Sequence, residues 1–208
     1  MSEQERKISL NFETIGSIAA MVIGATALFV AWDQAQVMRK QQHASVWPLL
    51  SDDFTIDKNE DGYVVELTLA NKGVGPALIE SAYVTIDGEP ASSRPAFMQG
   101  VFKNQQPAGS ARVNGSSIEG SALGAGDAVS VFKVTWPDTE DNRQSFSALA
   151  NRYVDGEGPQ VSLAVCFCSV FERCFLSEDQ YRPRGVKACP EQTDMFTNLL
   201  RDQSGADQ

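Results

Sequence analysis

Histidine is almost absent from this chain, which has one among its 208 residues, His43. Ser-His-Asp and Cys-His catalysis and histidine-rich metal sites all need an imidazole beside the reacting atom or the ion. The phosphate-binding patterns G-x-x-x-x-G-K-[ST] and G-x-G-x-x-G are also missing. Adjacent acids such as Asp52 with Asp53, or Glu140 with Asp141, are usually solvated surface groups rather than acid–base pairs. The sequence therefore predicts no enzyme, no catalytic or metal-ligating residue and no cofactor.

Basic residues are also few: 17 Lys and Arg stand against 27 Asp and Glu, for a formal net charge of -10. Nucleic-acid binding needs a basic surface that displaces counterions from phosphate, so no nucleic-acid partner is expected. With 42% hydrophobic residues, the chain is too apolar for a disordered protein and long enough for one folded core.

The chain has one long run without a charged residue, Thr14–Trp32. At 1.5 Å per helical residue this run spans about 28 Å, close to the hydrocarbon thickness of a bilayer. A buried soluble helix seldom stays uncharged on every face for this long. A cleaved signal peptide needs small residues after the apolar run, where this chain reads AWDQAQ. We therefore expect a tail at 1–12 and an uncleaved transmembrane helix at 13–33.

Small residues repeat along this expected transmembrane helix. They share one helical stripe: Gly16, Ala20, Gly24, Ala27 and Ala31. Small side chains let the backbone of a second helix approach closely, where lipid supplies no hydrophobic driving force for association. The stripe predicts a partner helix from another membrane protein or from a second copy of this chain, although an Ala-rich helix also produces such spacings by chance.

The residues after the apolar run are good helix formers without Gly or Pro, so the helix is expected to continue to about Ser45 and to stop near Pro48. This gives a helical stalk at 34–47. The folded domain follows at 48–200, with a short helix in TDMFTNLLRD near its end. The polar residues 201–208 are expected to be disordered.

Beyond the stalk the hydrophobic pattern has the two-residue repeat of half-buried strands. Apolar and polar residues alternate in DGYVVELTLANKG, AYVTIDG, DAVSVFKVTW and QVSLAVCFC, with turn compositions such as NKGVGP and GAGD between them. Two interruptions indicate short helices, SSRPAFMQGVF and DTEDNRQSFSALANRY. In the second, Asp138 or Thr139 can cap a helix with Phe146, Leu149 and Tyr153 on one face. The sequence therefore predicts a mainly β domain, a β-sandwich with one or two inserted helices.

Three segments carry a resemblance to known proteins: SVWP after the stalk, LANKGVGPA after a strand, and the late CFCSVFERCF. With the N-terminal helix, they resemble a group of bacterial single-pass membrane-anchored proteins of unassigned function with an immunoglobulin-like domain. NKGVGPA is similar to the N-x-G-x-G-P-A turn of many immunoglobulin-like bacterial modules, where the chain reverses between two core strands. Gly73 and Gly75 permit positive φ at such a turn, and Pro76 stiffens the next strand. The resemblance implies an immunoglobulin-like β-sandwich at a bacterial inner membrane, and no catalytic residues.

The four cysteines are the one chemical cluster in the sequence: Cys166, Cys168, Cys174 and Cys189. Strand alternation places Cys166 and Cys168 on one face, and a hairpin bend at 169–173 places Cys174 opposite Cys168. In an oxidising compartment we expect two disulfides, Cys168 with Cys174 and Cys166 with Cys189, one of three possible connectivities. A tetrahedral zinc site and buried free thiols are the alternatives. A thiol-redox enzyme is least favoured, because no C-x-x-C opens a helix.

The side of the membrane follows from charge and cysteine content together. Arg6, Lys7 and the terminal amine precede the helix while Arg39 and Lys40 follow it, a difference of about one charge. The even cysteine count and the acidic domain favour the oxidising side. The sequence therefore predicts a single-pass inner-membrane protein with its C-terminal domain in the periplasm; a cytoplasmic domain is the alternative.

The segment DKNEDG at 57–62 matches the first half of a calcium-binding loop. The twelfth position of such a loop, normally a bidentate Glu, is Thr68, and the flanking residues have strand patterns rather than helical ones. We therefore expect a polar hairpin turn in which Gly62 supplies the bend.

Two functional classes remain. The first is a membrane-tethered, non-catalytic interaction or accessory subunit, whose helix binds a partner's membrane helix and whose sandwich presents an edge or loop to another protein. The second is an extracytoplasmic sensor or binding domain for a small ligand or metal ion, with the cysteines or 57–62 as its site. The first is expected, because it needs no pocket.

Overall fold

The computed structural model of the chain describes residues 12–178 and 183–190. The chain divides into two compact units, Met1–Ser45 and Val46–Gln208. The short helix expected in TDMFTNLLRD and the disorder expected at the C-terminus lie outside the described residues. The same holds for the expected N-terminal tail, apart from its last residue.

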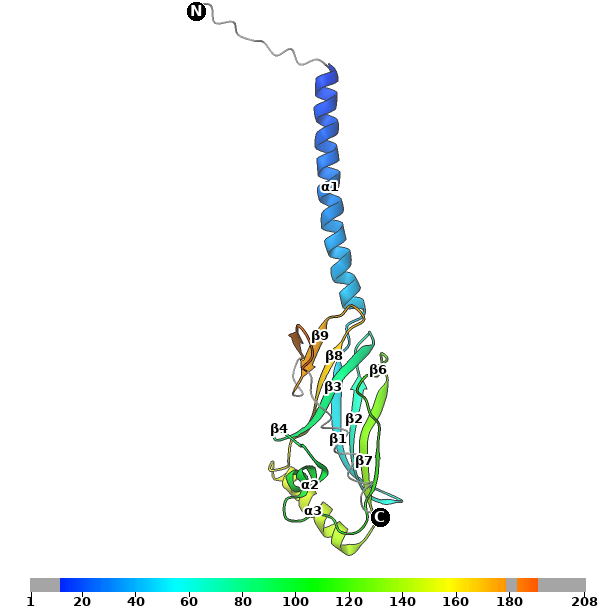
Figure 1. Cartoon of the computed structure of the whole chain (residues 1–208), viewed down its shortest axis with the longest axis vertical. Coiled ribbons are helices and arrows are strands. Elements are labelled where there is room, and N and C mark those ends of the chain that lie inside the picture. The colour runs from blue at the N-terminus through cyan, green and yellow to red at the C-terminus, as the bar shows by residue number, and fades with distance from the viewer. Residues whose placement is uncertain (1–11, 179–182, 191–208) are drawn as a thin grey trace, which may run out of the picture. The chain divides into compact units, whose positions relative to one another are not determined.

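The described part of the first unit is a helix, α1 (Phe12–Ser45; Figure 1). It begins one residue before the expected transmembrane span and ends two residues before the expected end of the stalk. Trp47 precedes Pro48, and a residue before proline is disfavoured in the helical region, which accounts for the end of α1 nearby. Within the described residues, α1 is the one helix long and apolar enough to cross a membrane, and none of its residues is buried.

The second unit is a mainly β domain built from two antiparallel sheets, called the β-domain below (Figure 1). Strands of the first sheet lie in the order β1 (Leu50–Asn59), β2 (Gly62–Asn71), β7 (Ala128–Trp136) and β5 (Arg112–Gly115). Strands of the second sheet lie in the order β10 (Arg184–Val186), β9 (Cys174–Ser177), β8 (Val161–Cys168), β3 (Ala77–Ile86) and β4 (Glu89–Pro90). The short strand β6 (Ala122–Leu123) pairs with the start of β3. The mainly β class expected from the sequence is confirmed.

The alternation of apolar and polar residues in the sequence gives each strand one buried face and one more exposed face. In β2, Val65, Leu67 and Leu69 are buried, whereas Glu66 and Thr68 on the opposite face are partly exposed. Successive side chains of a strand point to opposite faces, so the period of two decides which face enters the core.

Two short helices, α2 (Arg94–Phe102) and α3 (Glu140–Val154), lie together at one end of the β-domain (Figure 1). Both occupy positions where the sequence predicts a helix. Thr139 is the N-cap of α3, and its Oγ1 accepts a hydrogen bond from the backbone N–H of Asn142 at 3.3 Å. A cap of this kind satisfies one of the unpaired N–H groups at a helix start.

An aromatic cluster joins α3 to the core. Phe146 stacks against Tyr63 at 4.8 Å between ring centroids, and it packs edge-on against Phe102 and Trp136 at 5.3 and 5.6 Å. Burying each large aromatic side chain contributes on the order of 2 kcal/mol. Tyr153, expected on the same face of the helix, is 40% exposed and lies at the margin of the core.

Two carboxylates satisfy backbone donors of the second sheet. Oδ2 of Asp52 on β1 accepts the N–H of Leu163 on β8 at 3.0 Å, which links the two sheets. Oε1 of Glu119 accepts the N–H of Ala82 on β3 at 3.1 Å. Acidic side chains at strand edges also oppose pairing with other chains.

Candidate functional site

The small-residue stripe lies along α1. Its five members are all exposed in the structure: Gly16, Ala20, Gly24, Ala27 and Ala31. A Cβ atom added to Gly16 or Gly24 would meet nothing within 4 Å. The stripe therefore has room for the backbone of a second helix, and such a partner stays a prediction.

The four cysteines form two disulfides, Cys166–Cys189 and Cys168–Cys174. The register of β8 and β9 places Cys168 directly opposite Cys174, with 4.0 Å between their Cα atoms. The chain beyond β10 brings Cys189 back to Cys166, with a Cα–Cα distance of 5.6 Å. This pairing is the one expected from the sequence.

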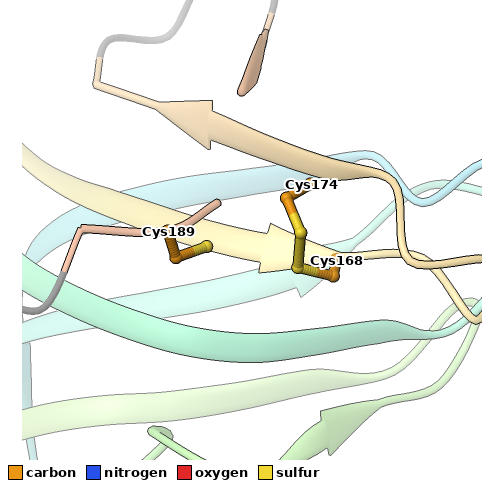
Figure 2. Close-up of side chains that lie close together, drawn as sticks. All are labelled: Cys168, Cys174 and Cys189. Atoms are coloured by element: carbon orange, nitrogen blue, oxygen red, sulfur yellow. A yellow bond between two sulfur atoms is a disulfide. The ribbon is translucent and has the colours of Figure 1, made fainter. Parts of the chain in front are cut away.

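The two disulfides lie side by side. The Sγ atoms of Cys168, Cys174 and Cys189 are all within 4.8 Å of one another (Figure 2). Among the described residues, this is the one group of three or more His, Cys, Asp or Glu side chains compact enough to hold a metal ion. Zinc needs thiolates, and each of these three sulfurs is part of a disulfide, so the oxidised protein offers no zinc site here.

The DKNEDG segment forms the β1–β2 hairpin turn, as expected. Asn59 pairs with Gly62, whose φ is 130°. The N–H of Lys58 donates to Oδ1 of Asp57 at 2.7 Å, and the N–H of Asp61 donates to Oδ1 of Asn59 at 3.0 Å. Two of the side-chain oxygens that a calcium ion would need, Oδ1 of Asp57 and Oδ1 of Asn59, therefore hold the turn instead.

An ion pair ties this hairpin to the segment before α3. Nζ of Lys58 lies 2.7 Å from Oδ2 of Asp138 and 5.1 Å from the centroid of the Tyr63 ring. The hydrogen bond between the two side chains raises the pKa of Lys58 and lowers the pKa of Asp138. Both side chains are about half exposed, so the pair contributes little to stability.

A shallow hollow of about 400 Å³ lies beside the same hairpin. Its lining includes an acid and a base, Asp61 and Arg112, together with Thr135 and Trp136 on β7. Opposite charges in one hollow favour a small polar ligand over an apolar one.

Asn71, at the end of β2, forms a buried hydrogen-bond network that was not predicted from the sequence. Its side chain is 1% exposed and makes four hydrogen bonds. Oδ1 accepts the N–H groups of Leu49 and Gly73 at 3.2 and 3.0 Å, and Nδ2 donates to the carbonyl oxygens of Gly75 and Leu123 at 2.8 and 3.0 Å. The sequence signal that could have identified Asn71 is its place as the first residue of the N-x-G-x-G-P-A segment. Asn71 joins the start of the β-domain to the β2–β3 connection and to strand β6.

The prediction of positive φ at Gly73 and Gly75 is wrong, because neither is among the residues with positive φ. A Cβ atom on Gly73 would lie 2.4 Å from the carbonyl oxygen of Trp47, and one on Gly75 would lie 2.1 Å from that of Val46. The glycines are needed because another backbone segment approaches closely. The connection also crosses from β2 in one sheet to β3 in the other, rather than joining neighbouring strands.

Exposed apolar side chains lie on two loops at one end of the second sheet. Val74, which is 66% exposed, lies in the β2–β3 connection, and Val170 and Phe171 lie in the turn between β8 and β9. Leu78 at the start of β3 pairs with Cys168 at the end of β8, so the two loops share one end of the sheet. Apolar groups exposed together are typical of interaction surfaces. We call Val74, Val170 and Phe171 the apolar loop cluster.

The one histidine, His43, lies on α1, where the sequence places it. His43 is therefore outside the β-domain. The candidate sites of the β-domain are the disulfide pair, the Asn71 network, the hollow and the apolar loop cluster.

Comparison with known proteins adds no relative: no protein-family model, no curated protein and no solved structure matches the chain.

Proposed function

We propose that this protein is a membrane-tethered, non-catalytic interaction or accessory subunit that binds another membrane protein, or a second copy of itself, through α1 and the β-domain. The observation that carries the proposal is α1, whose 34 residues include a membrane-length apolar run with no residue buried. An apolar surface of this length is stable only in lipid or against another apolar surface.

The proposed location is a bacterial inner membrane, which α1 crosses once as an uncleaved anchor, with the β-domain in the periplasm. The two disulfides support this side, because structural disulfides persist in oxidising compartments and are rare in the cytosol.

The proposed class of the β-domain is an immunoglobulin-like sandwich. Two antiparallel sheets around one core support it, as does the N-x-G-x-G-P-A segment that carries the chain between the sheets. In such domains the loops at one end are frequent contact surfaces. The apolar loop cluster is the proposed contact of the β-domain with its partner.

A second candidate function is a sensor or binding domain for a small ligand or metal ion. The hollow with Asp61 and Arg112 favours it, because these groups would recognise a ligand that carries both a donor and an acceptor. The interaction role is preferred because it uses both α1 and the apolar loop cluster.

Purification of the tagged full-length protein from membranes in mild detergent tests the proposal. A stoichiometric membrane partner or a homodimer is the expected result. Val74→Ser combined with Phe171→Ser should weaken the complex, while Val154→Ser, at a position 85% exposed on α3, should leave it intact. A lone monomer that carries a bound metal or small molecule would contradict the interaction role and support the second candidate.

A further inference from the structure

The two disulfides of the β-domain differ in their access to solvent. Cys166 is 1% exposed and Cys168 is 8% exposed, whereas Cys174 and Cys189 are half-buried. Each disulfide therefore joins one buried cysteine to one that is partly exposed. An incoming thiol would meet Cys174 or Cys189 first.

Opening the Cys168–Cys174 bond would leave its two strands paired. Backbone pairing of β8 with β9 runs from Val165 opposite Ser177 to Cys168 opposite Cys174, and the N–H of Ser169 donates to the carbonyl of Arg173 at 2.8 Å. The two sulfurs would thus stay in place after cleavage. The Sγ of Cys189 remains within 4.8 Å of both of them (Figure 2).

We propose that Cys168, Cys174 and Cys189 form a thiol–disulfide exchange site whose substrate is a small thiol. The incoming thiolate attacks Sγ of Cys174, forms a mixed disulfide and releases the Cys168 thiolate. That thiolate attacks Sγ of Cys189, forms a Cys168–Cys189 disulfide and releases Cys166, which takes a proton from water. Two S–S bonds break and two form, so the small thiol is oxidised and Cys166 is reduced.

Proximity drives the second step. Exchange requires a thiolate that reaches a disulfide sulfur, and holding the two together raises their effective concentration. Only thiolates carry out the exchange, so its rate should rise with pH. The reduced sulfur ends at Cys166, which is shielded from solvent oxidants by burial.

Cys166→Ser in the full-length protein tests whether Cys189 can exchange with the Cys168–Cys174 disulfide, because the substitution leaves Cys189 as a thiol beside that disulfide. Arg173 and Lys187 place Cys168, Cys174 and Cys189 on three separate tryptic peptides. After free thiols are blocked with N-ethylmaleimide, mass spectrometry should find the Cys189 peptide linked to each of the other two. These links should form faster at pH 9 than at pH 6.

Cys189→Ser is the matched control. It leaves a thiol at Cys166, which falls outside the group of three close sulfurs, so the Cys168–Cys174 disulfide should stay as it is. A thiol that remains on Cys189 alone at every pH in Cys166→Ser would overturn the proposal. Equal exchange in the two variants would do the same.

The unmodified protein with reduced glutathione provides a test that does not depend on folding of a variant. The expected product carries glutathione on Cys174, a Cys168–Cys189 disulfide and a blocked thiol at Cys166. Glutathione on Cys189, Cys166 or Cys168, or no adduct while the β-domain stays folded, would overturn the proposed order of attack.

Discussion

The backbone of Gly75 lies against that of Val46 so closely that a Cβ atom on Gly75 would be 2.1 Å from the Val46 carbonyl oxygen. Val46 is the first residue of the β-domain, and Gly75 lies in the connection that crosses between the sheets. The N-terminal segment of the domain is therefore packed into the fold, and it needs glycine at this contact.

We expect Gly75→Ala to destabilise the β-domain by about 1 to 3 kcal/mol, because the clash begins at Cβ and meets backbone rather than a flexible side chain. Gly75→Val should cost a similar amount or more. Thermal unfolding of the full-length protein, followed by fluorescence of the buried Trp136, measures the change. Gly185→Ala is the control, since its Cβ would meet nothing within 4 Å. Equal melting temperatures for Gly75→Ala and Gly185→Ala would show that the contact is absent.

Asn71→Asp is expected to lower the free energy of unfolding by about 3 kcal/mol. The carboxylate keeps both accepted hydrogen bonds, but it faces the carbonyl oxygens of Gly75 and Leu123 without a proton to donate. Urea titration of the full-length protein in detergent tests this. Asn114→Asp, at an exposed position of β5, should change stability by no more than about 0.5 kcal/mol. A similar loss for both variants would contradict the role of Asn71.

The two disulfides are expected to contribute unequally to stability. Cys166–Cys189 closes a sequence separation of 23 residues and Cys168–Cys174 one of 6, so loop closure gives the first about 3 kcal/mol and the second about 2. The double variant that removes Cys166–Cys189 should therefore lose more unfolding free energy than the one that removes Cys168–Cys174, with both cysteines changed to Ala in each case. A reducing agent should lower the melting temperature of the unmodified protein. If all four cysteines react with an alkylating reagent under denaturing, non-reducing conditions, the protein contains no disulfides and this prediction is wrong.

Stability should fall in alkaline solution as Tyr153 titrates. Its hydroxyl donates to the carbonyl of Pro159 at 2.6 Å, and burial raises the pKa of Tyr153 to about 12 from 10.0. Because tyrosine holds its proton more tightly in the folded domain, this stabilisation is complete below pH 10 and is lost as the pH rises from about 10 to about 12. Unfolding free energy measured across this range should decline less steeply for Tyr153→Phe. Parallel curves would contradict the prediction.

Association through α1 should depend on its small face. Leu at Gly16, Ala20 and Gly24 together should block close helix packing and reduce the complex seen by detergent co-purification to the level of unassociated protein. Leu at Ala19, on another face, is the control and should be tolerated. If both changes weaken the complex equally, the stripe is not the contact.

Several features could be predicted from the sequence because short-range rules control them. A charge-free run and helix-forming residues up to Ser45 decide the length of α1, since a helix is built from bonds between near neighbours. Thr139 caps α3 for the same reason. A hairpin of a few residues sets the register that places Cys168 opposite Cys174.

Only the tertiary structure decided which strands are neighbours. The two-residue period shows which face of β2 is buried, but it carries no information about the sheet to which β2 or β3 belongs. The prediction for Gly73 and Gly75 failed on this point, because it treated the segment as a local turn. The approach of Val46 and Trp47 that makes these glycines necessary exists only once the domain has folded.

The sequence alone determined the helix and the strand faces, both of which depend on residue type and spacing over a few positions. The tertiary structure decided the contacts that join distant segments. Asp52 and Leu163 are 111 residues apart, and the four partners of Asn71 come from three separate stretches of chain. The physical reason is that a polar side chain gains from burial only when its partners arrive with the correct geometry, and that geometry is a property of the whole packed domain.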